Sequence, residues 1–247
     1  MIKYKFEYDL DDPRRTLQHR ELILKKPFLK KLYLSWYNKI IKGAKDVPAG
    51  KKIEIGSGGG FLKDVFPEII SSDILPLSNC DLVFSAEEIP FENEELSLIC
   101  MVNVLHHIPS PAKFFTEAQR TLKINGKIIL IEPANSIFGR FIYQNFHHEP
   151  FKPSAGWEIE SSGPLSSANG ALPWIILERD QEEFYKKFPF LKITKLNYHT
   201  SFSYLLSGGV SRKGFVPDFS FEFINAFDNL ISSRLSGMFI YTEIKKF

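Results

Sequence analysis

The stretch KKIEIGSGGGFLKDV, residues 51–65, decides the fold. Its first five residues form a short β-branched run that predicts a strand, and the glycines after it predict a tight loop. A short helix is expected next. Because glycine has no Cβ, Gly56, Gly58 and Gly60 allow the loop to turn sharply and let its backbone approach a ligand closely. This strand–loop–helix unit predicts the start of a ligand-binding α/β fold.

Apolar runs recur along the chain on both sides of this unit. Further strands are predicted at residues 69–74, 80–85, 96–103, 126–133, 191–200 and 237–246. Helices are predicted at residues 20–42, 61–66, 111–124, 180–188 and 219–235, the third of them ended by Asn125-Gly126. The run at 96–103 is almost continuously apolar, which is typical of a parallel strand covered on both faces. Strands that alternate with helices predict an α/β fold with a doubly wound, mostly parallel sheet.

The rhythm stops after Pro133. Residues 134–174 are rich in Gly, Pro, Ser, aromatic residues and His, and they show no sustained period, which predicts a long lid or binding loop. We expect one domain over residues 1–247, with a helical cover at 1–47. A cofactor-binding half follows at 48–133, and a substrate-side loop with the closing strands occupies 134–247.

Composition narrows the class of protein. Apolar residues make up 44% and charged residues 24%, which is typical of a globular chain. The net charge of +2 gives no general attraction to nucleic acid. Cys80 and Cys100 lie in runs that predict buried strands, so both are expected to be free thiols. With no secretory h-region and no apolar run of about 18 residues, a cytoplasmic protein without integral membrane contact is expected.

Polar and glycine residues follow the predicted strands at their carboxyl ends. These residues are Gly56, Asp73, Ser85, Asn103 and Glu132. In an open α/β sheet, ligands bind in the crevice outside these ends, so one pocket can collect all of them.

The glycine loop does not fit the dinucleotide fingerprint. Counted from Gly56, the last position of G-x-G-x-x-G is Phe61, which removes the best motif for a nicotinamide cofactor. Asp73 lies 19 residues after Glu54, where a carboxylate can accept hydrogen bonds from both hydroxyls of an unphosphorylated ribose. The spacing favours an adenosine-type ligand.

Four segments together resemble a known family. They are EIGSGGG at residues 54–60, Asp73, SAEEIPF at 85–91 and VLHHIPSP at 104–111. This combination, which covers roughly residues 51–133, resembles the class I S-adenosylmethionine-dependent methyltransferases, particularly the type 11 methyltransferase domain family. HHEP after the fifth strand and SGGVS at 207–211 also resemble uncharacterised bacterial members.

The resemblance implies a Rossmann-like, seven-stranded sheet with one antiparallel strand near the C-terminus, and S-adenosylmethionine as cofactor. It also implies that Gly56 and Gly58 lie along the methionine moiety, Asp73 binds the ribose, Ala86 and Glu87 border the adenine, and Asn103 closes the methionine side. Ser85 stands where family members often carry Asp. The candidate cofactor residues are Glu54, Gly56, Ser57, Gly58, Gly60, Asp73, Ile74, Ser85, Ala86, Glu87, Asn103, Val104 and His107.

Candidate catalytic residues lie in the segment NFHHEPF. His147, His148 and Glu149 are candidates for removing a proton from an acceptor, since imidazole titrates near neutral pH. The alternative is that they form a hydrogen-bonded turn before Pro150. Methyl transfer from a sulfonium is an in-line displacement that requires no metal, so no metal site is expected.

Aromatic residues are candidates for the walls of the acceptor cavity. Those of the long loop and its surroundings are Phe138, Phe141, Tyr143, Phe146, Phe151 and Trp157. Tyr33, Trp36 and Tyr37 share a helical face, which fits either a lid over the sulfonium or ordinary core packing. His106 and His107 can face the cofactor or cap and pack.

The sequence thus predicts methyl transfer to a small-molecule or glycan-type acceptor. Alternatives are a nicotinamide-dependent reductase on a similar sheet, or a cofactor-binding regulatory subunit without turnover. Nucleic acid is not an expected partner, because Val102-Asn103-Val104-Leu105 lacks the Asn/Asp-Pro-Pro-aromatic run that holds a flipped base. The oligomeric state is left open.

Overall fold

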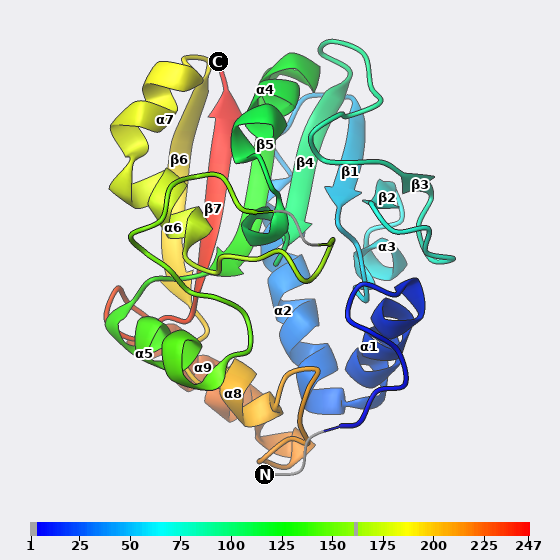
Figure 1. Cartoon of the computed structure of the whole chain (residues 1–247), viewed down its shortest axis with the longest axis vertical. Coiled ribbons are helices and arrows are strands. Elements are labelled where there is room, and N and C mark those ends of the chain that lie inside the picture. The colour runs from blue at the N-terminus through cyan, green and yellow to red at the C-terminus, as the bar shows by residue number, and fades with distance from the viewer. Residues whose placement is uncertain (1–3, 161–162) are drawn as a thin grey trace.

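The computed structural model describes residues 4–160 and 163–247 and is built around one sheet (Figure 1). Its seven strands are ordered β3-β2-β1-β4-β5-β7-β6. The strands are β1 Lys51–Ile55, β2 Ile69–Asp73, β3 Leu82–Val83, β4 Leu96–Val102, β5 Leu122–Pro133, β6 Leu191–His199 and β7 Phe239–Lys246. Only β7 runs antiparallel to its neighbours β5 and β6. The predicted fold class and the antiparallel strand near the C-terminus are confirmed.

Helices lie on both sides of the sheet and below its carboxyl ends. They are α1 Pro13–Lys25, α2 Pro27–Gly43, α3 Leu62–Val65, α4 Pro111–Thr121, α5 Ile137–Phe146, α6 Leu172–Trp174, α7 Gln181–Lys187, α8 Ser203–Ser207 and α9 Phe221–Ile231. Single turns at Leu105–His107 (η1), Ile175–Arg179 (η2) and Asp218–Ser220 (η3) complete the elements. The parallel strands point toward α1, α5 and α8 in Figure 1, while α4 and α7 cover the face turned to the viewer.

Two helices, rather than the single helix predicted over residues 20–42, precede the sheet. Asp12 accepts a hydrogen bond from the Arg14 amide and Pro13 occupies the first turn, so α1 begins earlier than predicted. Lys26 adopts an extended conformation before Pro27, because a residue that precedes proline is excluded from the helical region. The helical spacing of apolar residues thus runs through the break at Lys26, which is why the sequence predicted one helix. Trp36 and Leu32 of α2 are fully buried in the core.

Strand bounds differ from the prediction on both sides of β4. β5 begins at Leu122, directly after α4, and Asn125 stands inside it at φ +65°, so Asn125 and Gly126 do not end the preceding helix as predicted. β3 has two residues instead of the six predicted at 80–85. Cys80 is therefore part-buried in a loop, whereas Cys100 is buried in β4 as expected.

The segment 134–174 is more ordered than its composition predicts. Ser136 caps α5 by accepting a hydrogen bond from the Gly139 amide, and α6 closes the segment. The predicted helix at 180–188 is present as α7, but the Asp180 carboxylate makes no cap bond and instead accepts from Trp157 Nε1 at 3.0 Å. Within the described residues, the helices all lack the length and apolar character that crossing a bilayer requires.

Candidate active site

The carboxyl ends of β1, β2, β4 and β5 meet at a cavity of about 380 Å³. All thirteen predicted cofactor residues line it, and so do His147, His148 and Glu149. The parallel strands deliver the first set and the turn after α5 delivers the second (Figure 1). The fold thus brings together residues that are almost a hundred positions apart in the chain.

The glycine loop after β1 has a backbone that only glycine adopts easily. Gly56 and Gly58 have φ values of +68° and +48°. A Cβ on Gly56 would lie 2.5 Å from Val104 Cγ2, so the loop also packs tightly against the turn after β4. The Ser57 amide donates to the Ser72 carbonyl at 2.8 Å, which ties the loop to β2.

Asp73 ends β2 and joins the loop to the strand. Its Oδ2 accepts from the Gly58 amide and its Oδ1 from the Leu75 amide, each at 2.9 Å. Burial raises the pKa of the carboxyl, and the two amide bonds only partly offset this effect. Each oxygen retains a lone pair for a further donor.

Glu54 lies under the loop and is 3% exposed. Its Oε2 accepts a hydrogen bond from Ser57 Oγ at 2.7 Å. Burial raises the pKa of Glu54 to about 7, despite the bond from Ser57. The carboxyl group therefore orients the glycine loop from inside the protein.

Asn103 follows β4 at φ +59°, in the left-handed region. Its amide donates to the Ile131 carbonyl at 2.8 Å, while its buried Oδ1 has no hydrogen-bond partner among the described residues. A strained residue with an unpaired polar atom in a cavity is typical of a ligand contact. Nearby, Glu87 Oε1 accepts from the Ser110 amide at 2.7 Å and so holds the start of α4.

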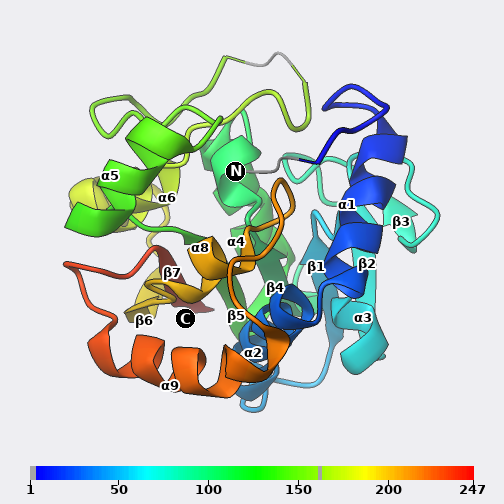
Figure 2. The ribbon, with the colours of Figure 1, turned by 90° about the horizontal axis from the view of Figure 1, so that it is seen from below.

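The N-terminal segment closes the cavity in a way the sequence analysis did not anticipate. Arg15, Thr16 and His19 of α1 line the cavity, and Thr16 Oγ1 is buried without a partner among the described residues. Asp11 Oδ1 accepts from the Leu165 amide at 2.6 Å, so the long loop is fastened to the N-terminus across the cavity (Figure 2). The Asp12-Pro13 cap signal marks α1, but no local pattern places it over the cavity.

The predicted aromatic walls are mostly wrong. Of the six residues proposed from the long loop, only Tyr143 lines the cavity. Phe141 and Phe146 are exposed, because α5 turns that face to solvent, whereas Phe151 and Trp157 are buried in the core. Tyr33 and Tyr37 of α2 line the cavity. Trp36, on the same helix, packs in the hydrophobic core instead. The aromatic load thus serves mainly the core.

Glu132, at the end of β5, organises the turn after β4. Its Oε1 accepts from the Val104 and Leu105 amides at 2.8 Å, and its Oε2 lies 2.6 Å from His106 Nδ1. Burial opposes a charge on His106, but Glu132 and Glu149 outweigh it and raise the pKa of His106 to about 10.

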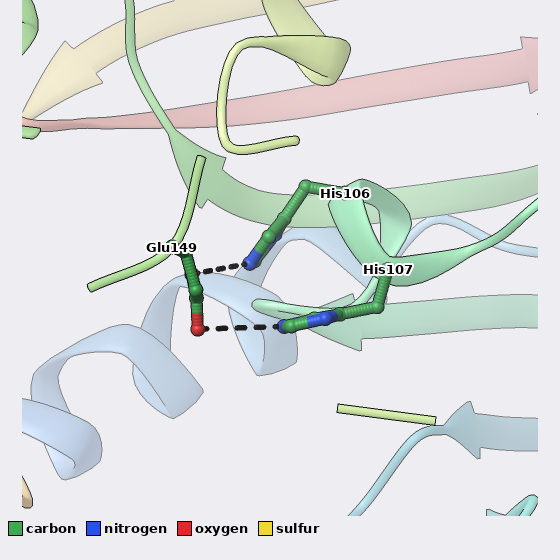
Figure 3. A group of neighbouring side chains, drawn as sticks. All are labelled: His106, His107 and Glu149. Carbon is green, nitrogen blue, oxygen red and sulfur yellow. Dashed lines mark ion pairs between the residues drawn. The ribbon is translucent and has the colours of Figure 1, made fainter. Parts of the chain in front are cut away.

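Glu149 faces this turn from the HHEP segment (Figure 3). Glu149 Oε2 lies 3.4 Å from His106 Nε2, and Oε1 lies 3.8 Å from His107 Nε2. His147 Nδ1 and His148 Nε2 each stand 3.6 Å from its oxygens. Burial opposes the charge, yet the surrounding histidines hold the pKa of Glu149 well below its usual range. Burial lowers the pKa of His107 to about 4, which leaves its imidazole neutral.

Residues 53–130 match the family model of the methyltransferase domain. This part of the chain is similar to a methyltransferase domain. The matched residues run from β1 into β5, and they include the glycine loop, Asp73 and Asn103. An uncharacterised protein of Methanocaldococcus jannaschii is 29% identical over 120 residues, or 45% of this chain. The match spans 58% of the length of that relative.

Solved structures show the same fold over almost the whole chain. A Thermotoga maritima protein, described as a SAM-dependent methyltransferase and possible histamine N-methyltransferase, aligns with a TM-score of 0.56 and 17% identity over 94% of this chain and 99% of its own. The geranyl diphosphate C-methyltransferase of Streptomyces coelicolor A3(2), solved with S-adenosyl-L-homocysteine, aligns at 0.52 and 11% identity over 96% of this chain and 83% of its own. The fold is that of the class I methyltransferases, whose methyl donor is S-adenosylmethionine.

Proposed function

We propose that the chain transfers a methyl group from S-adenosylmethionine to a small-molecule or glycan-type acceptor. The observation that carries the proposal is the cavity itself, in which the glycine loop, Asp73 and Asn103 form one wall and the HHEP segment forms another. We take the first wall as the cofactor side and the second as the acceptor side of one cavity. Such an arrangement suits a reaction in which alignment of two reactants supplies most of the rate.

The cofactor side fits an adenosine-bearing amino acid. Asp73 has acceptor capacity left on both oxygens for ribose hydroxyls, beyond its bonds to the Gly58 and Leu75 amides. Ile74 is 53% exposed and lines the cavity, which provides an apolar surface for adenine. The unpaired Asn103 Oδ1 can accept from the amino group of the methionine moiety. When bound, the cofactor supplies an electrophilic sulfonium methyl group.

The acceptor side supplies a group that can take a proton. The pKa of Glu149 is held well below its usual range by the surrounding histidines, although burial opposes this, so its carboxylate is a weak base. His147 Nδ1 accepts a hydrogen bond from the Glu149 amide at 3.4 Å, which occupies the lone pair of a neutral imidazole. His148 is the remaining candidate, and we assign to it the removal of a proton from the acceptor; its Nε2 lies 3.6 Å from Glu149 Oε1.

We infer the class of acceptor from the volume of the cavity and from the segment that covers it. A cavity of about 380 Å³ lies at the lower end of the range for small ligands, roughly 300–1,000 Å³. The Asp11 bridge to residues 165 and 166 covers it, which favours a small acceptor over a folded macromolecule. The Streptomyces protein with the same fold was solved with a small diphosphate ligand.

Calorimetric titration of the full chain with S-adenosylhomocysteine and, separately, with NADH tests the cofactor. We expect binding of the first and no heat with the second; the reverse would favour a nicotinamide-dependent reductase. Transfer of label from methyl-labelled S-adenosylmethionine to a library of hydroxyl and amine metabolites tests turnover. Cofactor binding without product across the library would contradict the activity and favour a regulatory subunit.

A further inference from the structure

We propose that His106, His107 and Glu149 form a binding site for a divalent transition-metal ion of the zinc class. One nitrogen of each imidazole and the carboxylate of Glu149 gather within 4.8 Å of one another at the wall of the cavity. Two imidazoles and one carboxylate are a ligand set that zinc takes in catalytic sites, where a fourth position stays open. The site lies beside the proposed acceptor position and is supported by geometry independent of methyl transfer.

Each of the two imidazoles has a hydrogen-bond partner at Nδ1, as metal-binding histidines usually have. His106 Nδ1 lies 2.6 Å from Glu132 Oε2, and His107 Nδ1 lies 2.8 Å from the Ser167 carbonyl. A proton on each Nδ1 satisfies these acceptors and leaves the lone pair on Nε2, the atom that faces Glu149. Carboxylate and backbone-carbonyl partners of this kind are what fix the tautomer and orientation of metal-bound histidines.

The distances from the two imidazoles to the two oxygens of the Glu149 carboxylate fit a shared metal ion. Glu149 Oε2 lies 3.4 Å from His106 Nε2, and Oε1 lies 3.8 Å from His107 Nε2. Both distances exceed the usual 2.7–3.2 Å of an N–H···O bond. Ligand bonds of about 2.0–2.1 Å in a tetrahedron separate neighbouring ligand atoms by roughly 3.3–3.4 Å. In Figure 3 the two rings converge on the carboxylate from one turn of the chain.

A second trio, His147, His148 and Glu149, shares the carboxylate but has a weaker arrangement. His147 Nδ1, the atom that faces Glu149, already accepts a hydrogen bond from the Glu149 amide. His148 is 57% exposed, so its ring is not fixed by surrounding atoms. By contrast, His106 is 2% exposed and His107 is 12% exposed. The ion therefore belongs with the turn after β4.

The charge at the site also favours a cation. Glu132 lies at Nδ1 of His106 and Glu149 at Nε2, so two carboxylates stand on opposite sides of the ring. A bound divalent ion would take the place of a proton on His106 Nε2. Because all three residues line the cavity, a fourth coordination position would be open to it. A hydroxyl oxygen of an acceptor, or a water molecule, is the ligand expected there, and coordination would lower its pKa.

The full chain, freed of metal with a chelator, is titrated calorimetrically with Zn²⁺ alone, and binding of Co²⁺ is followed by its visible absorption. We expect one ion per chain and a tetrahedral Co²⁺ spectrum. His107→Asn and Glu149→Gln should each weaken binding more than about 100-fold, since loss of an outer-shell partner alone weakens metal sites about 10- to 100-fold. His148→Asn, the matched control, should retain full affinity and the same spectrum.

Absence of stoichiometric binding to the unaltered chain would overturn the site, as would equal affinity in His107→Asn. Loss of affinity in His148→Asn with retention in His107→Asn would move the ion to the second trio and also contradict the assignment. Binding of S-adenosylhomocysteine and thermal unfolding are measured on the same samples. A folded chain that binds this nucleoside but no metal would reject the metal site and leave the proposed methyl transfer standing.

Discussion

Asp73 is the residue on which the cofactor side depends most. Its carboxylate binds the Gly58 and Leu75 amides and keeps acceptor capacity for a ligand. We expect Asp73→Ala to weaken binding of S-adenosylhomocysteine by about 1–3 kcal/mol, because a charged hydrogen bond is lost. Calorimetry measures the change, with the exposed Glu88→Gln as control. Equal affinity of Asp73→Ala and the unaltered chain would reject the ribose assignment.

A substitution at Asn103 can test cofactor binding and stability separately. Glycine adopts its φ of +59° without strain, so Asn103→Gly should leave the free energy of unfolding unchanged within about 1 kcal/mol. The same change removes the unpaired Oδ1 and should weaken cofactor binding by about 1 kcal/mol. Denaturant unfolding and calorimetry on one preparation give both values. A stability loss with unaltered affinity would assign Asn103 a purely structural role.

Glu54 predicts a pH dependence of stability. Burial raises its folded-state pKa to about 7 from an ordinary value of 4.5, so the native state favours the protonated form. Its contribution to stability is therefore present below pH 4.5 and is lost as the pH rises toward 7. Glu54→Gln should be more stable than the unaltered chain at pH 8, by up to about 3 kcal/mol, and equally stable near pH 4.5. Urea unfolding at both values checks this, and a constant difference would contradict it.

The glycine loop is the element that positions the cofactor. Gly56→Ala would place a Cβ 2.5 Å from Val104 Cγ2 and strain a left-handed backbone, which alone costs about 1–2 kcal/mol. We expect a lower melting temperature and loss of S-adenosylhomocysteine binding. Gly156→Ala is the matched control, since no atom of the described residues lies within 4 Å of a Cβ there. Similar behaviour of the two variants would show that the loop geometry is unimportant.

The turn after α5 is the element on the acceptor side. His148→Ala should reduce methyl transfer about 100-fold or more while sparing cofactor affinity, because it removes a general base. His147→Ala serves as the comparison, because His147 binds the backbone of the same turn. Equal losses of turnover in both variants would indicate damage to the turn instead of loss of a base.

Elements with a strong local signal were predictable, and those that depend on distant contacts were not. β1, β2 and β4 are buried runs next to glycine or polar residues, and their positions are confirmed within a residue. α5 was missed because its residues Ile137–Phe146 carry several aromatics and no first-turn acid, although Ser136 caps it. β3 is short because its only neighbour in the sheet is β2, at the edge.

At the scale of the molecule, the chain brings its N-terminal helix, glycine loop and HHEP segment to one cavity. The sequence predicts which residues lie at strand ends, because parallel strands end at one edge. It does not predict that Asp11 fastens residues 165 and 166 over the cavity, nor that Glu132 and Glu149 sandwich His106. Those contacts join segments 26 to 155 positions apart, and no spacing rule encodes them.

A crystal structure of the full chain with S-adenosylhomocysteine provides the decisive observation. We predict the ribose hydroxyls within hydrogen-bond distance of the Asp73 carboxylate, the methionine moiety along Gly56 and Gly58, and the sulfur facing the HHEP segment. Nucleoside density away from the Asp73 carboxylate, or a sulfur turned from His148 and Glu149, would contradict the assignment of a cofactor side and an acceptor side to this cavity.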